Sequence, residues 1–367
     1  MFNDNWDKTK ERFEALWQRE RIGRPTVSIL FFEKSLSLQD NTINLGSPTS
    51  LVHDEQSESF ERYFTDPEFM YTTIKSQLER ICCVGDAFLS VNPYLGSNSH
   101  SAFTTKSKYQ FADETIWFFP VIDDIEKDEI TFDDSSELLK VMRSKLDYLI
   151  NIPGRRFVVS NTDNCSSLDA LASLRGSQDL LVDMLTEEDH IKRHIGSLQS
   201  ILWKTESEFL PRLVSANDGG TSTDWMQLWC PGKHHQLQCD ISVMISPELF
   251  EKYALPELEQ NAEWFDHTVY HLDGQEQIRH LDMLLSIKGL DLIQWTPVAA
   301  QPDTSTFIEV LKRIQKAGKG LVLMPKSNEM PKLLDELDPA GVHYVLQDIK
   351  TLEEANDMMR LIDKKTG

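Results

Sequence analysis

The sequence lacks the features that mark membrane-spanning, nucleic-acid-binding and secreted proteins. No apolar run approaches the roughly 20 residues that cross a bilayer. The amino-terminal segment MFNDNW is polar and acidic, unlike a signal peptide. Runs of Lys or Arg are absent, and the formal net charge is −22, which argues against a nucleic-acid partner. These absences predict a cytoplasmic protein without nucleic-acid or membrane partners.

Cysteine is sparse, and the common cofactor and hydrolase motifs are missing. The five cysteines are scattered and odd in number, which does not fit a disulfide framework, so reduced thiols are expected. The chain has no paired CxxC, no Gly-rich phosphate loop and no nucleophile elbow. The chemistry therefore has to be sought in residues that the fold brings together.

The segments that are present alternate between strand-like and helix-like. Residues 6–20 predict an amphipathic helix, 26–32 a strand, and the polar stretch 33–65 an insertion or lid. Helices are expected at 67–83, 135–150, 176–213, 247–265, 275–286, 304–317, 328–337 and 351–364. Strands are expected at 86–91, 115–120, 156–160, 224–229, 237–243, 268–272, 291–295, 320–324 and 342–346, with 115–120 a candidate side hairpin. This alternation predicts an α/β fold, either a barrel or a doubly wound sheet.

Several of these strands end in polar or aromatic residues instead of ordinary turn residues. In a barrel the carboxyl ends of the strands converge on one face, where function lies. The alternative is that each is a plain loop residue. The candidates for a small-molecule site on this face are Asn161, Asp163, Trp229, Asp240, His271, Asp273, Gln294 and Trp295.

The sharpest local motif is His271-Leu272-Asp273-Gly274. Alternation along a strand puts His271 and Asp273 on the same side. Three interpretations stay open: an acid/base pair, two ligands of one metal, or Asp273 as the cap of a helix that begins near Gln275. Zinc in a catalytic site needs a third protein ligand, which the sequence does not identify; Cys239 and Asp240 are candidates by residue type only. The motif predicts chemistry at the end of this strand.

Tryptophan offers a second signal near the same strand ends. Trp225, Trp229 and Trp295 could form an aromatic wall for a flat or methylated ligand. Aromatic filler beneath the strand ends is an equally good interpretation of the same three residues.

At these residues the chain resembles the uroporphyrinogen decarboxylase and corrinoid methyltransferase superfamily. The resemblance runs from about Phe13 to about Ile362 and is strongest over 224–301. It rests on the segments Leu168–Leu171, Leu174–Gly176, Gln238–Asp240, Ile245–Phe250, Leu255–Leu258, Tyr270–Gly274 and Ile293–Trp295. It implies a (β/α)8 TIM barrel in one domain, 1–367. Within it, residues 1–66 would supply an amino-terminal helix, the first strand and an irregular lid-like insertion.

One branch of this superfamily consists of decarboxylases that grip substrate carboxylates with arginines and contact pyrrole nitrogens with an Asp. Asp86 stands near the position of that Asp, while Arg24 and Arg175 are the nearest candidates for the grip. The chain keeps arginines near its amino terminus but not the Arg-Gln-Ala-Gly-Arg segment or its spacing. A polycarboxylate needs several Arg forks, so porphyrinogen decarboxylation is the weaker expectation.

The other branch consists of methyltransferases that use zinc and work with a corrinoid held on a partner protein. Their motif resembles His-x-Cys with a later Cys. Here His271 matches, Asp273 replaces the first Cys, and 320–350 contains no Cys. A carboxylate ligand changes the metal preference, so zinc or another divalent metal at His271 and Asp273 stays open. The resemblance also implies a homodimer.

The resulting hypothesis is an enzyme with methyltransferase-type chemistry, either corrinoid-linked methyl transfer or demethylation, on a small molecule. His271, Asp273 and Asp86 are its candidate catalytic residues. Decarboxylation of uroporphyrinogen or another polycarboxylate is the alternative. A barrel that binds a small molecule without turnover is the third interpretation.

Overall fold

A seven-stranded sheet forms the centre of the molecule, which we describe from a computed structural model over residues 5–32, 57–113, 115–298 and 300–367. All neighbouring strands are parallel except β2 and β1, which are antiparallel. Nearly all residues of β1 and β9–β13 are buried, as expected of strands covered on both faces. In spatial order the strands are β2 (Ile81–Gly85), β1 (Thr26–Phe32), β13 (Val342–Leu346), β12 (Gly320–Leu323), β11 (Leu292–Thr296), β10 (His267–Asp273) and β9 (His234–Leu237).

The remaining strands form three separate pairs. These are parallel β3 (Ser90–Val91) with β6 (Val158–Val159), antiparallel β4 (Tyr109–Phe111) with β5 (Ile116–Phe118), and antiparallel β7 (Gly220–Thr223) with β8 (Leu228–Pro231). β3 and β6 are only two residues long, and the ladders of the described residues do not close into a ring. The α/β class is confirmed, and so is the side hairpin at 115–120. The closed eight-stranded barrel is not shown.

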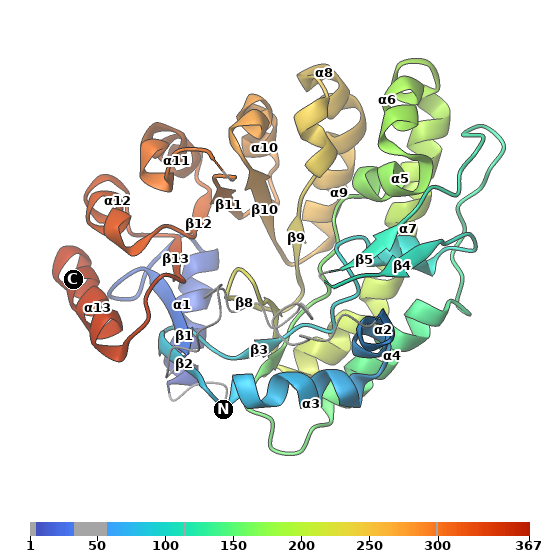
Figure 1. The fold of residues 1–367 in the computed structure, drawn as a ribbon. Coiled ribbons are helices and arrows are strands. Elements are labelled where there is room, and N and C mark those ends of the chain that lie inside the picture. The colour runs from blue at the N-terminus through green and yellow to red at the C-terminus, as the bar shows by residue number, and fades with distance from the viewer. Residues whose placement is uncertain (1–4, 33–56, 114, 299) are drawn as a thin grey trace.

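Helices surround the strands, with α10–α13 outside β10–β13 (Figure 1). They are α1 (Trp6–Trp17), α2 (Ser57–Thr65), α3 (Pro67–Leu78), α4 (Glu137–Ile150), α5 (Ser167–Arg175), α6 (Ser177–Thr186), α7 (Glu188–Ala216), α8 (Pro247–Leu249), α9 (Leu255–Trp264), α10 (Leu281–Ser286), α11 (Ile308–Lys316), α12 (Met330–Glu336) and α13 (Leu352–Thr366). No helix in the described ranges has both the length and the apolar character needed to cross a bilayer.

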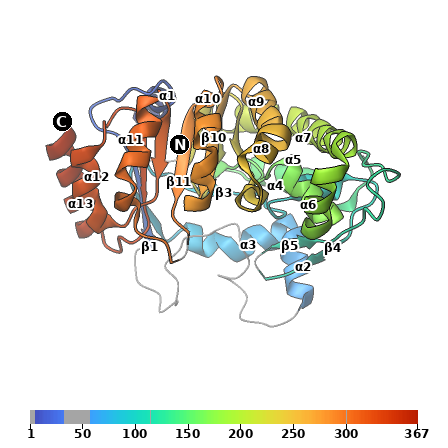
Figure 2. The same cartoon turned by 90° about the horizontal axis from the view of Figure 1, so that it is seen from above.

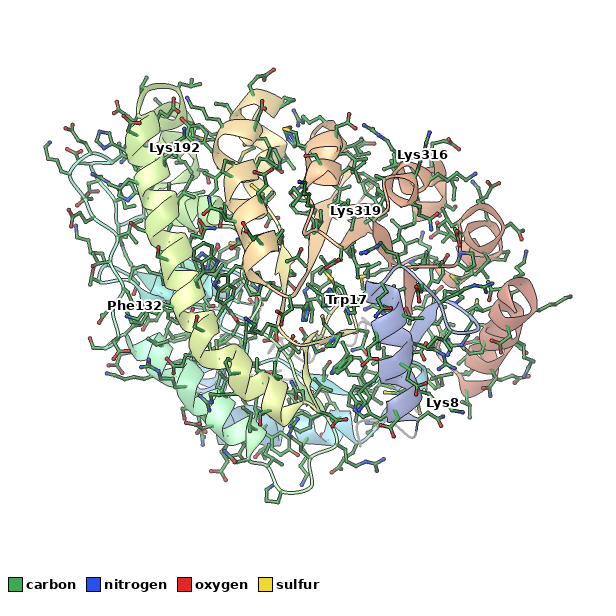
Figure 3. All side chains as sticks on the ribbon, turned by 180° about the vertical axis from the view of Figure 1, so that it is seen from behind. Lys8, Trp17, Phe132, Lys192, Lys316 and Lys319 are labelled. Carbon is green, nitrogen blue, oxygen red and sulfur yellow. The ribbon has the colours of Figure 1, made fainter. Side chains whose placement is uncertain are left out.

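Helix α1 covers the amino-terminal ends of β9 and β10. The ring of Trp17 lies 5.8 Å from that of His234 and 5.0 Å from that of His267, the first residues of these two strands. Trp17 lies on α1 (Figure 3), and α1 and α2 are on opposite sides of the molecule (Figure 2). Because α1 occupies the amino ends, the carboxyl ends of β9 and β10 are the ends left for a functional site.

The observed bounds of several elements differ from the predicted ones. The segment 33–56, most of the predicted insertion, lies outside the described residues, and the rest of it contains α2. The predicted helix 67–83 ends at Leu78, and Cys82 and Cys83 belong to strand β2. The predicted helix 176–213 is two helices, since Glu187 has non-helical backbone angles between α6 and α7.

Candidate functional site

His271 and Asp273 lie together at the carboxyl end of β10. Strand alternation places both side chains on one face, with 3.9 Å between His271 Nε2 and Asp273 Oδ1. Their side chains are 16% and 35% exposed, so a small molecule can reach both. Trp225 covers the imidazole edge, at a ring distance of 5.1 Å in a T-shaped arrangement. The predicted same-side placement of the histidine and the carboxylate is confirmed.

Gln294 on the neighbouring strand β11 fixes the orientation of the imidazole. Register pairs His271 with Gln294, and the Gln294 side-chain oxygen is bonded to Nδ1. Because the Gln294 oxygen can only accept a hydrogen bond, Nδ1 carries the proton of the neutral imidazole and donates it in this bond. Nε2, beside Asp273, is then unprotonated. Burial lowers the pKa of His271 below its usual value, although the bond to Gln294 and the charge of Asp273 oppose that shift. At neutral pH the side chain is therefore a base.

Asp163 enters the site from the loop after β6. Gln236 on β9 donates its amide to Asp163 and accepts the indole N–H of Trp225 at 3.1 Å. Burial, followed by the nearby charges of Asp224 and Asp240, raises the pKa of Asp163 to about 7. Near neutral pH this carboxyl is thus partly protonated and can donate a proton.

Asp224 joins the same group from the end of β7. Its Oδ1 accepts from Asn92 Nδ2 at 3.1 Å and from Ser160 Oγ at 3.3 Å, and burial raises its pKa. The other amide atom of Asn92, Oδ1, is buried without a partner in the described part of the chain. A ligand that donates a hydrogen bond would satisfy it.

Asp240 completes a group of four carboxylates with Asp163, Asp224 and Asp273, which we call the carboxylate cluster. Its backbone is held by Asp169 on α5, whose carboxylate accepts the backbone N–H of Asp240 at 3.0 Å. Asp240 is more exposed than the other three. Its pKa is nevertheless raised, by partial burial first and by Asp273 second.

The charged side chains of the carboxylate cluster are all acidic. No lysine or arginine within the described ranges forms an ion pair with the carboxylate cluster, and Asn92 Oδ1 adds a buried acceptor without a partner beside it. A negatively charged ligand would meet repulsion from these carboxylates. The arrangement therefore suits a neutral or cationic ligand that carries hydrogen-bond donors.

A metal centre at His271 and Asp273 does not fit the donor set. Among the described residues no group of three or more His, Cys, Asp or Glu is arranged to hold a metal ion. Cys239, a third ligand by type, is fully buried, and burial raises its pKa well above the usual value. The thiolate that zinc prefers is thus disfavoured there, and we derive no step that involves a metal.

Two of the predicted aromatic site residues lie elsewhere. Trp229 packs against α1: its carbonyl accepts the indole N–H of Trp17 at 2.9 Å, and its ring contacts Trp6 at 5.8 Å. Trp295 is fully buried and contacts Phe307, next to α11, at 4.7 Å. Gln294 points toward His271, and successive side chains on a strand point to opposite faces, so the Trp295 side chain points away from His271.

Asp86 is also separate from the site. It precedes β3 and is fully buried, bound by Arg24 at 2.6 Å and by Arg12 at 2.9 Å, and its backbone N–H is bonded to Val27 near the start of β1. These contacts use both arginines to neutralise Asp86. The amino-terminal arginines Arg12 and Arg24 therefore have a structural role here, as the ion-pair partners of Asp86.

Arg175 and Asn161, the other two predicted substrate contacts, are bound to other parts of the protein. Arg175 pairs with Asp183 at 2.7 Å and donates to the carbonyl of Asp123. Asn161 is buried and donates to the carbonyl of His234 at 2.7 Å, which links β6 to the start of β9. Neither side chain forms a hydrogen bond or an ion pair with His271 in the described part of the chain.

Four residues of the site were not among the predicted contacts: Asn92, Asp224, Trp225 and Gln236. The sequence alternation Gln236-x-Gln238-x-Asp240 is a signal that could have identified Gln236, although only Gln236 lies on β9, which ends at Leu237. Trp225 was considered only as part of an aromatic wall. Asp224 gave no signal, because the strand before it, β7, was not predicted.

Comparison with known proteins supports the fold. No protein-family model matches the chain, and no curated protein has a matching sequence. Among solved structures, a methyltransferase from Methanosarcina mazei is similar, with a TM-score of 0.56 and 12% sequence identity. The match covers 97% of this chain and 98% of that chain. At this identity the similarity is one of fold, over nearly the full length of both proteins.

Proposed function

We propose that this chain is an enzyme of the uroporphyrinogen decarboxylase and corrinoid methyltransferase superfamily, with methyltransferase-type chemistry on a small molecule. The observation that carries the proposal is the placement of His271 and Asp163 in one site, joined through Trp225, which contacts the His271 ring, and Gln236, which bonds to both Trp225 and Asp163. The pKa of His271 is lowered and that of Asp163 is raised to about 7. Environments that separate a base from an acid in this way are typical of catalytic sites. The fold similarity to a methyltransferase supports the reaction class.

The pair His271 and Asp163 suits the proton balance of methyl transfer. When a methyl group moves from a nitrogen or oxygen atom to an acceptor that carries a proton, two proton transfers are needed. The nitrogen or oxygen that loses the methyl group must gain a proton, and the acceptor must lose one. Asp163 would donate the proton to the leaving atom. His271 Nε2 would take the proton of the acceptor. The products are the methylated acceptor and the protonated leaving group, and no other reactant is required.

The charge of the site narrows the substrate class. The carboxylate cluster and the unpartnered Asn92 Oδ1 are acceptors, so the substrate is expected to be neutral or cationic and to carry N–H or O–H groups. Trp225 offers an aromatic surface beside them. A polycarboxylate is not favoured, because Arg24 and Arg175 are already paired with Asp86 and Asp183.

A donor screen with a corrinoid acceptor tests the proposal. The purified chain is mixed with cob(I)alamin and, separately, with methanol, mono-, di- and trimethylamine, and a methoxylated aromatic. Formation of methylcobalamin is followed by absorbance. We expect turnover with at least one donor, and we expect Asp163→Asn to lower it by about 100-fold or more, the usual contribution of a general acid.

The role of His271 as the base is tested in a second assay, in which methylcobalamin is the methyl donor and a thiol or an amine is the acceptor. Here His271→Gln should lower the rate by about 100-fold or more. His190→Gln, on α7 and outside the site, serves as the matched control and should leave the rate unchanged. Unaltered rates in Asp163→Asn and His271→Gln would refute the assignment. Tight binding of a donor without any turnover would favour a binding protein and refute the enzyme.

A further inference from the structure

A cavity lies apart from the candidate active site, between α3, β2 and the turn that precedes β6. Its volume is about 630 Å³, within the range of small-molecule sites. Its walls include Leu78 from α3, Cys83 from β2, Leu89 from the segment before β3, and Phe157 from the turn. Figure 1 shows α3 and β2 near one another at the lower edge of the view.

The polar part of this cavity is basic in an acidic protein. Lys75, Arg155 and Arg156 line it together with a single carboxylate, Glu79, although the chain carries a net charge of −22. Lys75 and Arg156 are exposed, and neither has an ion pair with a described carboxylate. Cations that are not neutralised by the protein are available to an anionic ligand.

The third cation, Arg155, is held in place by the backbone. Its Nη1 donates to the carbonyl of Phe157 at 2.6 Å, and its Nη2 donates to the carbonyl of Ala216 at the end of α7. Gly154, with φ of +67°, provides the left-handed turn just before it. A guanidinium fixed in this way loses little conformational entropy when a ligand binds.

The other part of the cavity is apolar. Leu78 and Phe157 are buried, and the rings of Tyr71 and Phe157 pack with 5.8 Å between their centroids. Burial raises the pKa of Cys83 to about 12, so this side chain is a neutral thiol at physiological pH. The cavity thus combines an apolar wall with a cationic edge.

We propose that this cavity binds an organic anion, with an apolar or flat body against Leu78 and Phe157. Its phosphate or carboxylate head would contact Lys75 and Arg156, with the positive charge of Arg155 beside them. Guanidinium groups bind both kinds of head through paired N–H donors. Such a ligand differs in charge from the neutral or cationic substrate expected at the carboxylate cluster.

The position of the cavity separates it from the candidate active site. Leu89 and Phe157 precede β3 and β6, whereas Asn92 and Asp163 follow those strands. The β3–β6 ladder, which pairs Ser90 with Val158, stands between the two sites. The binding proposed here therefore does not rest on the reaction proposed above.

Fluorescent probes of matched shape test the charge requirement. Anilinonaphthalene sulfonate has an aromatic body and one anionic head, and N-phenylnaphthylamine has a similar body without the head. The full-length wild-type chain should bind the sulfonate with a stoichiometry of one. In Lys75→Glu/Arg156→Glu the affinity should fall by about tenfold or more, because attraction is replaced by repulsion.

Three controls make the outcome decisive. Lys364→Glu, an exposed substitution on α13, changes the net charge without touching the cavity and should keep the wild-type affinity. N-phenylnaphthylamine should bind the wild type and the double variant equally. Circular dichroism checks that the double variant is folded, which is expected because both side chains are exposed. Unchanged sulfonate affinity in the folded double variant, or an equal loss in Lys364→Glu, would overturn the proposal.

Competition identifies the head group. Decanoate and adenosine monophosphate share an organic body and carry a carboxylate or a phosphate, respectively. At least one of them should displace the sulfonate probe from the wild type at a concentration at which inorganic phosphate does not. Displacement by neither organic anion, or by inorganic phosphate equally well, would contradict a site that needs both an apolar body and a charged head.

Discussion

At the scale of single residues, burial has opposite effects on the base and the acid of the candidate site. It lowers the pKa of His271, because the charged form of an imidazole is its protonated form, and raises that of Asp163 to about 7, because the charged form of a carboxyl is its deprotonated form. A neutral imidazole and a partly protonated carboxyl therefore coexist near pH 7. Burial therefore favours both a proton acceptor, His271, and a proton donor, Asp163, at the same pH.

Asp86 has a structural role at this scale. Asp86→Asn removes the buried negative charge that neutralises Arg24 and Arg12, and leaves the buried Arg24 with only the exposed Asp363 as a counter-charge. The free energy of unfolding should fall by about 3–5 kcal/mol, as for other broken buried pairs. Urea denaturation measures this change.

The matched control is Asp363→Asn. Asp363 lies 3.9 Å from the same Arg24, but its side chain is 65% exposed, so the free energy of unfolding should change by less than about 0.5 kcal/mol. Equal effects of the two substitutions would contradict the structural role of Asp86. Methyl-transfer activity of the folded Asp86→Asn fraction should match the wild type.

At the scale of elements, patterning predicted the long buried strands and failed for the short ones. β10, β11, β12 and β13 are apolar runs in a parallel sheet, and each was predicted within two residues of its bounds. β7 was missed and β8 displaced, because Gly220–Thr223 has no apolar run and Gln227 adopts a positive φ of 47° that separates the two strands. Such turns depend on tertiary contacts that no local pattern shows.

The same distinction holds for the candidate site. His271, Asp273 and Gln294 were predictable, because strand alternation places them on one face. The structure instead places Trp229 of β8 against α1, and Trp295 toward the helix layer on the opposite face of β11 from Gln294. Long-range packing, not residue type, decides which tryptophan reaches the site.

Helix α13 allows a test of local stability. Thr351 caps it by accepting the backbone N–H of Glu354 at 3.2 Å, within a reciprocal capping box. Thr351→Ala should lower the free energy of unfolding by about 1 kcal/mol. Thr72→Ala, at an exposed position inside α3, should be neutral or slightly stabilising, since Ala has the higher helix propensity. Thermal unfolding of the two variants compares them; an equal loss in both would contradict the capping role.

At the scale of the whole molecule, buried carboxyl groups link stability to pH. Burial raises the pKa of Glu206 to about 7, against 4.5 for the free side chain. The folded chain therefore keeps this proton up to about pH 7, whereas the unfolded chain loses it near 4.5. The contribution of Glu206 to stability is fully present below about pH 4.5 and is lost as the pH rises through 7.

Glu206→Gln should remove this dependence. The amide keeps an oxygen that can accept the hydrogen bonds of Thr162 and Asn164. At pH 8 the variant should be more stable than the wild type by up to about 3 kcal/mol, and near pH 4.5 the two should be similar. Urea denaturation at both pH values measures the difference, with exposed Glu259→Gln as the control. A variant that is less stable than the wild type at pH 8 would contradict the assignment.

The state of His271 gives the most direct test of the central claim, which is a neutral base at the end of β10. Imidazole nitrogen NMR of the labelled protein, with the His271 signals identified by their loss in His271→Gln, reports both protonation and tautomer. We predict a neutral ring at pH 7 with the proton on Nδ1 and a titration midpoint below 6.5. A ring that is charged at pH 7, or that carries its single proton on Nε2, would contradict the account.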